Sequence, residues 1–436
     1  MMKNIWIRIL GRFEKRRRGL VFVYQKAGLK AALSYLIFRK YIGSHDYCKR
    51  KKKLAEIRKK ERITVAFQVI SLGKWKSDTV YRAMLRSPRF RPVMWIVDEP
   101  GAPEQEKVVE RTSLKAHFSK LNYEFSEATS WMQIDEEIKP DIVFICDPYF
   151  VPLNMPPQID NRLVCYVRYG MPNTFTASGT DLFLHNFALF YFMESKFIAE
   201  ENRKLMTNKG QNIAVTGHPM VDFLLEPPDV PSSVWKDEGK NRKKIIWAPH
   251  WTIKNKSFYE ASTFLSFADS MVDIAKKYAD VLQIAFKPHP NLYRVLSSES
   301  VWGKSKTDEY YNLWATMPNT QLETGAYREL FQQSDAMIHD CGSFILEYLL
   351  MNKPCMYLDR GDGKQNLNDM NKEALKCYSI GKTSGDIERF IEEKVMGQKD
   401  ELMCQRRDFC NKYLLPPGGK TAAENILDAI LGTSDH

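Results

Sequence analysis

The sequence lacks an apolar run long enough to cross a bilayer. Its longest nearly uncharged apolar stretch, residues 182–193, is interrupted by His185 and Asn186, whereas a bilayer crossing needs roughly 20 residues. The short apolar run near the N-terminus, residues 20–24, stops with no small-residue cleavage site after it. We therefore expect neither a transmembrane protein nor a secreted one, and we expect the chain to stay in the cytosol.

Metal-binding patterns are also missing. The eight cysteines form no Cys-x-x-Cys pair and have no histidine at zinc-finger spacing, so we predict buried, reduced cysteines rather than zinc sites or disulfides. No Asp-x-Asp pair occurs, which removes the usual carboxylate clamp for a metal–nucleotide complex. We expect no metal and no cofactor, so any phosphate chemistry has to rely on cationic side chains and helix dipoles.

The excess of positive over negative charge is confined to the N-terminal segment. Residues 1–62 hold 20 Lys or Arg and four acidic residues, a balance of +16, so the net charge of +11 leaves −5 for the remainder. This distribution argues against a protein that is basic throughout for nucleic-acid binding. With 436 residues, 44% of them apolar, the chain exceeds what one hydrophobic core usually holds, which predicts two domains.

The basic N-terminal segment carries apolar residues at helical spacing. One stripe begins at Ile5 and precedes four consecutive basic residues, 15–18, and a second begins at Leu29. Amphipathic helices of this kind lie on anionic membranes, where each basic residue adds about 1 kcal/mol. We predict that residues 1–62 form membrane-associating helices. The alternatives are helices that pack on the folded body, and nucleic-acid binding, for which the segment lacks the interleaving of aromatic and basic residues that is typical of RNA-binding modules.

From Arg62 onward, short β-rich runs alternate with helical stretches, which is typical of parallel sheets covered on both faces. Residues 226–244 are rich in proline and charge, as linkers are. We predict an α/β protein with two Rossmann-like, doubly wound domains that face a cleft, preceded by the basic helical segment. The domains are expected at residues 63–225 and 245–436.

In the second half, polar residues follow three predicted strands at the edge where such sheets bind ligands. His250 follows one strand, Lys287 and His289 follow the next, and residues 340–343 (Asp-Cys-Gly-Ser) lie between a third strand and a helix. A glycine at a helix start lets the backbone approach a phosphate, and the N–H groups and the dipole favour an anion; an ordinary helix cap is the alternative. We expect Lys287 and His289 to present two cations to one diphosphate.

Short motifs in this half resemble those of the CDP-glycerol glycerophosphotransferases, the membrane-associated primases and polymerases of teichoic acid-like polymers, which have the GT-B arrangement of two Rossmann-like domains. In the order of the family they are Gly217-His218-Pro219-Met-Val-Asp222, Ala248-Pro249-His250-Trp251, Lys287-Pro-His289-Pro290, Ser334-Asp335, and Asp340-Cys-Gly342-Ser343 with Glu347 and Lys353-Pro354. Each motif is short, but the ordered set spans about 140 residues and is specific.

The resemblance implies roles for individual residues. His289 would contact the donor pyrophosphate, Gly342 and Ser343 would cradle its phosphates, and Glu347 would meet the ribose. The site residues predicted together are, for catalysis, His289, Tyr169 and His250; for the donor phosphates, Lys287, Asp340, Gly342 and Ser343; for the nucleotide, Pro249 and Glu347; and for the acceptor side, Arg168, Gly170, His218 and Asp222.

One motif of the resembled family is altered in the first half. The family carries Trp-His-Gly-Thr-Pro, whose histidine is the base on the acceptor hydroxyl, whereas residues 168–172 read Arg-Tyr-Gly-Met-Pro. A phenol with a pKa near 10 is a poor base at neutral pH. Tyr169 is therefore either a base activated by a cation such as Arg168 or an aromatic wall for the acceptor. In the second case the candidate bases are His250, His218 and His185.

These features predict a transferase that moves a phospho-polyol, such as glycerol phosphate, from a CDP-activated donor to a hydroxyl of a lipid-linked or glycan acceptor. It would serve the synthesis of a bacterial cell-surface polymer, as a peripheral protein at the cytoplasmic face of the plasma membrane. Its expected partners are the CDP-polyol, the acceptor and an anionic membrane surface, and not nucleic acid. The alternatives are a GT-B glycosyltransferase that uses a nucleotide sugar and a catalytically silent membrane scaffold.

Overall fold

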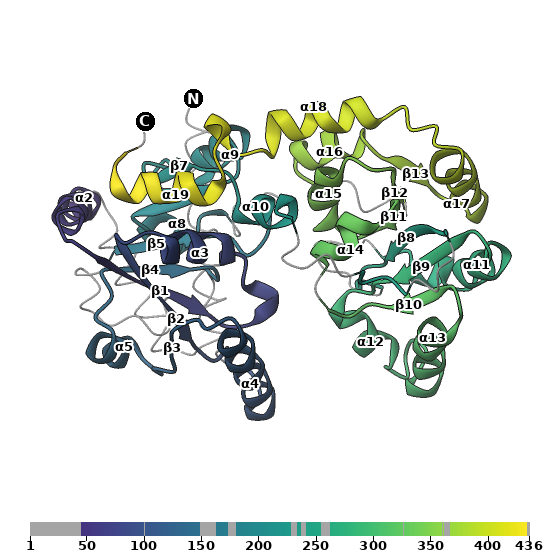
Figure 1. Cartoon of the computed structure of the whole chain (residues 1–436), viewed down its shortest axis with the longest axis horizontal. Helices are drawn as coiled ribbons and strands as arrows, with labels where there is room; N and C mark the ends of the chain where they lie inside the picture. Colours follow the sequence, from purple (N-terminus) through teal and green to yellow (C-terminus); the bar gives the residue numbers. More distant parts are fainter. Residues whose placement is uncertain are drawn as a thin grey trace, which may run out of the picture. The chain divides into compact units, whose positions relative to one another are not determined.

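The structure is a computed structural model that describes residues 45–99, 101–148, 163–172, 180–227, 233–236, 241–253, 262–325, 327–359, 361 and 367–433. The two apolar stripes predicted near the N-terminus, which begin at Ile5 and Leu29, lie outside the described residues. The chain divides into two compact units, and Figure 1 shows the elements of each. The first unit comprises Met1–Met171, Thr176–Asp222 and Pro416–His436, and the second Pro172–Phe175 and Phe223–Leu415.

The first unit is built on a parallel sheet, with the strand order β3-β2-β1-β4-β5-β6-β7 among the described residues. The strands are β1 (Ile63–Val69), β2 (Phe90–Ile96), β3 (Phe125–Ser126), β4 (Ile142–Ile145), β5 (Leu163–Val167), β6 (Phe190–Met193) and β7 (Ile213–Val215). The helices are α2 (His45–Arg58), α3 (Asp78–Arg86), α4 (Glu104–Lys120), α5 (Trp131–Glu137), α8 (Phe183–Phe187), α9 (Lys196–Leu205) and α19 (Ala422–Leu431), with α10 (Pro219–Leu225) at the boundary between the units.

Segments from both ends of the chain complete the first unit. Helix α19 packs on α3 and contributes residues such as Ile426 and Ile430 to the buried core. Helix α2 contributes Leu54 and Ile57, and Arg58 donates hydrogen bonds to the last carbonyls of α19. The sequence analysis assigned α19 to the second domain and α2 to the membrane-associating segment; both belong instead to the first unit, because their apolar faces are buried in its core.

The second unit is built on a separate parallel sheet, with the strand order β10-β9-β8-β11-β12-β13. The strands are β8 (Lys243–Ala248), β9 (Leu282–Phe286), β10 (Thr320–Leu322), β11 (Ala336–His339), β12 (Cys355–Leu358) and β13 (Ser379–Gly381). The helices are α11 (Phe264–Lys277), α12 (Pro290–Leu296), α13 (Lys304–Thr316), α14 (Arg328–Gln333), α15 (Phe344–Glu347), α16 (Asp369–Leu375), α17 (Ser384–Arg389) and α18 (Met403–Tyr413).

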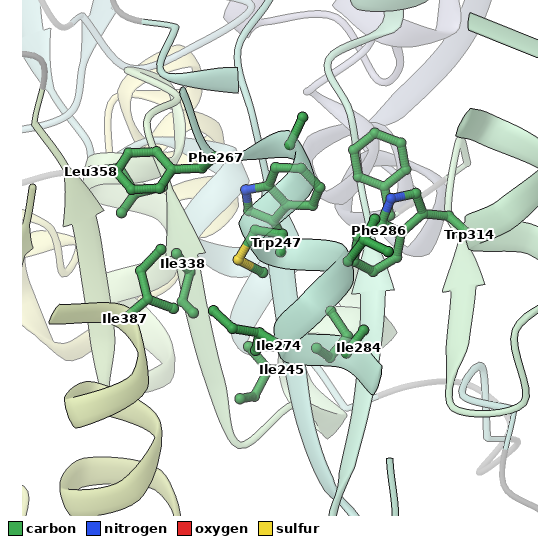
Figure 2. Packing of buried hydrophobic residues seen from close by; sticks show 14 of the residues in the cluster. Ile245, Trp247, Phe267, Ile274, Ile284, Phe286, Trp314, Ile338, Leu358 and Ile387 are labelled. Carbon is green, nitrogen blue, oxygen red and sulfur yellow. The ribbon is translucent and has the colours of Figure 1, made fainter. Parts of the chain in front are cut away.

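Aliphatic and aromatic side chains together form a core of the second unit between its sheet and one helical layer (Figure 2). The ring of Trp247 in β8 stacks on Phe286 in β9 with 5.0 Å between centroids, and Phe286 lies 5.3 Å from Trp314 in α13. Aromatic side chains bury large areas, so this cluster holds β8 and β9 rigidly. The backbone at the ends of these two strands, from which the loops of His250 and Lys287 begin, is therefore held in place.

The prediction of two α/β domains with parallel sheets is confirmed. The division between them falls after Asp222, slightly before the predicted linker, and β8 begins at Lys243, inside that predicted linker. Within the described parts of the chain, no helix combines the length and apolarity that a membrane crossing requires. Six of the eight cysteines are buried, as predicted, whereas Cys48 and Cys404 are exposed.

Candidate active site

The predicted donor residues of the second unit come together at one sheet edge. Strands β9, β8 and β11 are neighbours, and their carboxyl ends are followed by Lys287, His250 and Asp340. The backbone N–H of His289 donates to the carbonyl of Pro249 at 3.0 Å, which ties the loop after β9 to the loop after β8. The strand order thus brings together three motifs that are far apart in the sequence.

His289 is the N-cap of α12, and its tautomer is fixed. The backbone N–H of Asn291 donates to Nδ1 of His289 at 3.1 Å, so the proton of the neutral ring must be on Nε2. Burial lowers the pKa of His289 to about 4, which keeps the ring neutral at pH 7. In this structure His289 thus presents a neutral Nε2–H donor in place of the expected cation.

His250 packs against His289 and is held by its own loop. The two imidazole centroids lie 5.0 Å apart in an edge-on arrangement, and Nδ1 of His250 is 2.9 Å from the Thr252 hydroxyl. Burial, together with the neighbouring His289, lowers the pKa of His250 to about 3. Both rings are therefore uncharged, which allows them to lie in contact.

Asp340 positions this loop rather than pointing out of it. It accepts hydrogen bonds from the backbone N–H of His250 at 2.5 Å, from the Thr263 hydroxyl at 2.8 Å and from the Thr263 backbone N–H. The side chain is fully buried, and burial raises its pKa to about 7. Asp340 was predicted among the phosphate-binding residues, but its oxygens connect the end of β8 to the start of α11.

Lys287 lies in a second cluster, with a residue that the sequence analysis did not identify. Its ammonium donates to the carbonyl of Gly325 at 2.8 Å and lies 5.5 Å from the ring of Tyr327. The hydroxyl of Tyr327 donates to Oε2 of Glu347, the predicted ribose ligand, at 2.7 Å. Tyr327 therefore contacts both Lys287 and Glu347, while the His289 ring contacts His250 and Trp251.

Gly342 and Ser343 form a tight turn before α15. The carbonyl of Gly342 accepts from the N–H of Ile345 at 3.3 Å, and Ser343 has helical dihedral angles with no cap bond from its hydroxyl. Gly342 is buried, whereas Ser343 is exposed. An exposed hydroxyl and a Gly backbone at a helix start are what the predicted phosphate cradle requires.

In the first unit, Arg168 points away from the predicted acceptor site. Its guanidinium donates to the Tyr191 hydroxyl and, at 2.9 Å, to Oδ1 of Asn202, and it lies 3.7 Å from a carboxylate oxygen of Glu194. Burial would lower the pKa of Arg168, but Tyr191 and Glu194 outweigh it and raise the pKa overall. The neighbouring Tyr169 is 38% exposed, and a Cβ at Gly170 would meet no atom within 4 Å, so both border open space.

His218 and Asp222 have structural roles. The backbone N–H of Met220 donates to Nδ1 of His218 at 3.1 Å, and Nε2 of the same ring donates to the carbonyl of Arg168 at 3.0 Å. Asp222 accepts from the first two N–H groups of α19, each at 2.8 Å. The acceptor-side prediction for these two residues is corrected: they hold the loop after β5 and cap α19.

Two of the three candidate bases are locked in the interior of the first unit. Burial lowers the pKa of His218 to about 4 and that of His185 to about 3. His185 lies 2.8 Å from the Thr180 carbonyl through Nδ1, and its Nε2 is buried with no hydrogen-bond partner in the described structure. Neither ring reaches solvent, and the third candidate base, His250, likewise has a pKa lowered to about 3, so none of the three is a strong base at pH 7.

The described residues contain no cluster of three or more His, Cys, Asp or Glu side chains that could hold a metal ion.

The sequence analysis also missed Lys74 and Asp147, which form an ion pair of 2.8 Å beside Tyr169. They follow β1 and β4, so the same rule of polar residues at strand ends could have found them.

We compared the chain with known protein families and with curated proteins. Residues 191–365 match the protein family described as CDP-Glycerol:Poly(glycerophosphate) glycerophosphotransferase. No curated protein matches the chain in sequence.

Solved structures share the fold at low sequence identity. A variant of the wall teichoic acid polymerase TagF, soaked with CDPG, is 16% identical with a TM-score of 0.56, covering 93% of this chain and 98% of that chain. The UDP-GlcNAc 2-epimerase from Neisseria meningitidis, bound to UDP-GlcNAc, is 14% identical with a TM-score of 0.54, covering 86% and 100%. S. aureus MnaA with UDP is 13% identical with a TM-score of 0.53, covering 84% and 96%. These likenesses concern the fold, and the predicted GT-B-like class is confirmed.

The family match spans every motif on which the resemblance was based, from Gly217 to Pro354. It includes the loops that carry His250 and His289, and the helix α15 that carries Glu347. Through residues 191–365 the chain is therefore similar to the CDP-glycerol glycerophosphotransferase family, and the predicted enzyme class, a CDP-glycerol glycerophosphotransferase-like transferase, is confirmed.

Proposed function

We propose that the protein transfers glycerol phosphate, or a closely related phospho-polyol, from a CDP-activated donor to a hydroxyl group, with CMP as the leaving group. The observation that carries the proposal is the fixed Nε2–H donor of His289 at the ligand-binding edge of the second sheet. A neutral donor of this kind can bind diphosphate oxygens without changing its protonation state, because its pKa of about 4 lies well below neutral pH.

The other donor residues complete the arrangement. The buried carboxylate of Glu347, held by the Tyr327 hydroxyl, is suited to accept hydrogen bonds from ribose hydroxyls. The turn at Gly342 and Ser343 can bring backbone N–H groups and one hydroxyl to the phosphates. Asp340 holds the loop of His250 in place, so that Pro249 accepts from His289 and the site is preorganised.

The chemical step requires positioning and charge stabilisation more than covalent catalysis. The acceptor oxygen forms a bond to the transferred phosphorus while the bond from that phosphorus to the CMP oxygen breaks, and the proton of the acceptor hydroxyl passes to the departing CMP phosphate or to solvent water. The His289 donor would stabilise the charge that develops on the diphosphate oxygens.

The acceptor side is proposed at Tyr169 and Gly170, and the acceptor is a lipid-linked or glycan hydroxyl. The basic N-terminal segment would hold the enzyme on the anionic cytoplasmic face of the plasma membrane. Helix α2 supports this part of the proposal, because Lys49, Lys51 and Lys52 are exposed while its apolar residues Leu54 and Ile57 are buried.

Phosphorus NMR of the purified protein with CDP-glycerol or UDP-GlcNAc distinguishes the possible reactions. The mixture contains two acceptors, a neutral oligosaccharide and a glycerol phosphate oligomer. The proposal predicts release of CMP from CDP-glycerol and a new phosphodiester resonance. Release of UDP from UDP-GlcNAc with CDP-glycerol intact would replace the proposal with the glycosyltransferase alternative, and no reaction of either donor would favour the scaffold.

A further inference from the structure

Two buried amide side chains of the second unit bind the same backbone carbonyl. Nδ2 of Asn368 and Nδ2 of Asn371 each donate to the carbonyl of Pro172 at 2.9 Å. A carbonyl oxygen has two lone pairs, so the two bonds saturate it. Asn368 is 5% exposed and Asn371 is fully buried. We call this arrangement the Pro172 anchor. It is a specific hydrogen-bonded site for one peptide group, at positions where apolar side chains would cost less to bury.

Hydrogen bonds within the Pro172 anchor orient both amides. Asn368 is the N-cap of α16, and its Oδ1 accepts from the backbone N–H of Asn371 at 2.8 Å and from Nδ2 of Asn371 at 2.9 Å. Oδ1 of Asn371 is buried with no hydrogen-bond partner in the described part of the chain. An unpaired buried amide oxygen costs free energy, so Asn371 contributes through its donor side, which is bound to Pro172 and Asn368.

Pro172 follows a short loop whose other end is fixed separately. We call residues 169–171, which include the proposed acceptor residues, the acceptor loop. Before the loop, the carbonyl of Arg168 accepts from Nε2 of His218 at 3.0 Å, and the Arg168 guanidinium is bound inside the first unit. After the loop, the division between the two units falls directly before Pro172. The acceptor loop is thus held at one end by the first unit and at the other by the second.

Helix α16 joins the Pro172 anchor to the proposed donor residues. It packs on α15, and Figure 1 shows the two helices side by side. The hydroxyl of Tyr378, three residues after α16, donates to the carbonyl of Ile345 in α15 at 2.9 Å. Helix α15 follows Ser343 and carries Glu347. Because closely packed helices transmit displacements to one another, a donor bound at α15 acts on the helix that holds Pro172.

We propose that Asn368 and Asn371 are positioning residues that couple the two substrate sites. They hold the acceptor loop through Pro172, and the donor acts on them through α15 and α16. The inference rests on the proposed function, because that function places the donor at α15 and the acceptor at Tyr169. Donor binding then fixes the acceptor loop. Coupling of this kind is reciprocal, so the acceptor should raise the affinity for the donor by the same factor.

The test uses Asn368→Asp in the full-length protein. Aspartate is as good an N-cap as asparagine, so α16 keeps its cap, but a carboxylate has no hydrogen to donate to Pro172. Asn371→Ala is a second variant that removes a donor to Pro172 without adding charge. The matched control is Asn319→Asp, because the Asn319 amide is also buried in the second unit and donates to two backbone carbonyls, neither of them that of Pro172.

Hydrogen exchange measures the coupling without turnover. The backbone amides of the acceptor loop are followed by mass spectrometry with and without CDP-glycerol, in the absence of an acceptor. In the wild type we expect CDP-glycerol to slow their exchange about threefold or more, because the donor fixes the loop. In Asn368→Asp and Asn371→Ala the exchange should be faster, and CDP-glycerol should no longer slow it. Asn319→Asp should respond as the wild type does.

Steady-state kinetics separate this role from a general loss of structure. Asn368→Asp should lower kcat/KM for the acceptor about 5- to 20-fold, because one of the two hydrogen bonds to Pro172 is lost. The affinity for CDP-glycerol, measured by calorimetry, should stay within about threefold. In a protein that already carries Tyr169→Ala, Asn368→Asp should cost less than about twofold, because the side chain that it positions is gone.

The inference is overturned if Asn368→Asp and Asn319→Asp affect the exchange of the acceptor loop and the acceptor kinetics equally. It is also overturned if the wild-type loop does not respond to CDP-glycerol that is bound, or if the losses from Asn368→Asp and Tyr169→Ala multiply. Failure of the proposed function gives a different result, because the wild type would then neither bind CDP-glycerol nor release CMP from it.

Discussion

The hydroxyl of Tyr327 donates a hydrogen bond of 2.7 Å to Oε2 of Glu347, and the ring of the same tyrosine lies 5.5 Å from the ammonium of Lys287. One side chain therefore contacts two predicted donor residues from different motifs. Tyr327 is buried enough that desolvation, together with Glu347, raises its pKa well above the usual value. The phenol stays protonated, so it remains a donor to the carboxylate.

Tyr327→Phe tests this positioning role. The variant keeps the ring beside Lys287 but releases Glu347, so we expect the KM for the CDP-polyol to rise about 5- to 30-fold with little change in kcat. The matched control is Tyr311→Phe, because the Tyr311 hydroxyl is buried with no hydrogen-bond partner in the described structure. Equal donor KM values in the two variants would contradict the role.

Asp340→Asn should destabilise the second unit. The amide keeps one acceptor oxygen but turns an NH2 group towards buried donors such as the Thr263 N–H, which leaves at least one of them unpaired. We expect the free energy of unfolding to fall by about 1–3 kcal/mol in urea titrations. Asp369→Asn, which alters an exposed ion pair with Lys372, should change it by less than about 0.5 kcal/mol. A cost no larger than that of the control would mean that Asp340 does not hold the loop.

The pH dependence of stability follows from the buried histidines. The pKa of His218 falls from its usual 6.5 to about 4 in the folded state because the ring is buried. A depressed pKa means that the unfolded chain binds the proton more tightly, so stability that is present above pH 6.5 is lost as the pH falls towards 4.

For His218 this loss amounts to about 2 kcal/mol between pH 7.5 and pH 5. His218→Gln removes the titrating group. The free energy of unfolding of this variant should therefore fall over the same interval by about 2 kcal/mol less than that of the wild type. Urea titrations at both pH values give the comparison. Identical losses in the wild type and the variant would show that His218 does not carry this dependence.

A truncation that tests the membrane proposal must leave α2 intact, because Leu54, Ile57 and Arg58 of this helix pack in the first unit. Removal of residues 1–44 should weaken binding to vesicles that contain anionic lipid at physiological salt. Replacing Lys49, Lys51 and Lys52 by Ala in the full chain should also weaken vesicle binding. The matched control replaces the exposed Lys372, Lys376 and Lys382. Unchanged vesicle binding after the truncation would contradict the proposal.

The sequence predicted which loops meet at one edge of the second sheet, because the signals for these loops are local. His250, Lys287 and His289 each follow a β-rich run directly, and parallel sheets place strand ends at one edge, so no knowledge of packing was needed.

Other features depend on long-range packing that no local pattern encodes. Tyr327 meets Lys287 and Glu347 only through the tertiary fold. The motif that contains Gly217 and Asp222 suggested an acceptor site, but Gly217 has φ +85° and leaves no room for a Cβ against Pro416, and Asp222 caps α19. The motif therefore holds the C-terminal segment Pro416–His436 on the first unit, whereas the sequence analysis placed this segment in the second domain.

The most direct test of the account is CMP release from CDP-glycerol by the wild type and by His289→Asn, followed by phosphorus NMR. Asparagine is a good N-cap, so the variant should keep α12 and fold, but it lacks the Nε2–H donor. Loss of one such contact should cost about 2–4 kcal/mol in the transition state, or roughly 30- to 1,000-fold in kcat/KM. The account predicts a loss in this range with CMP as the wild-type product. Wild-type rates in His289→Asn, or release of CDP instead of CMP, would contradict it.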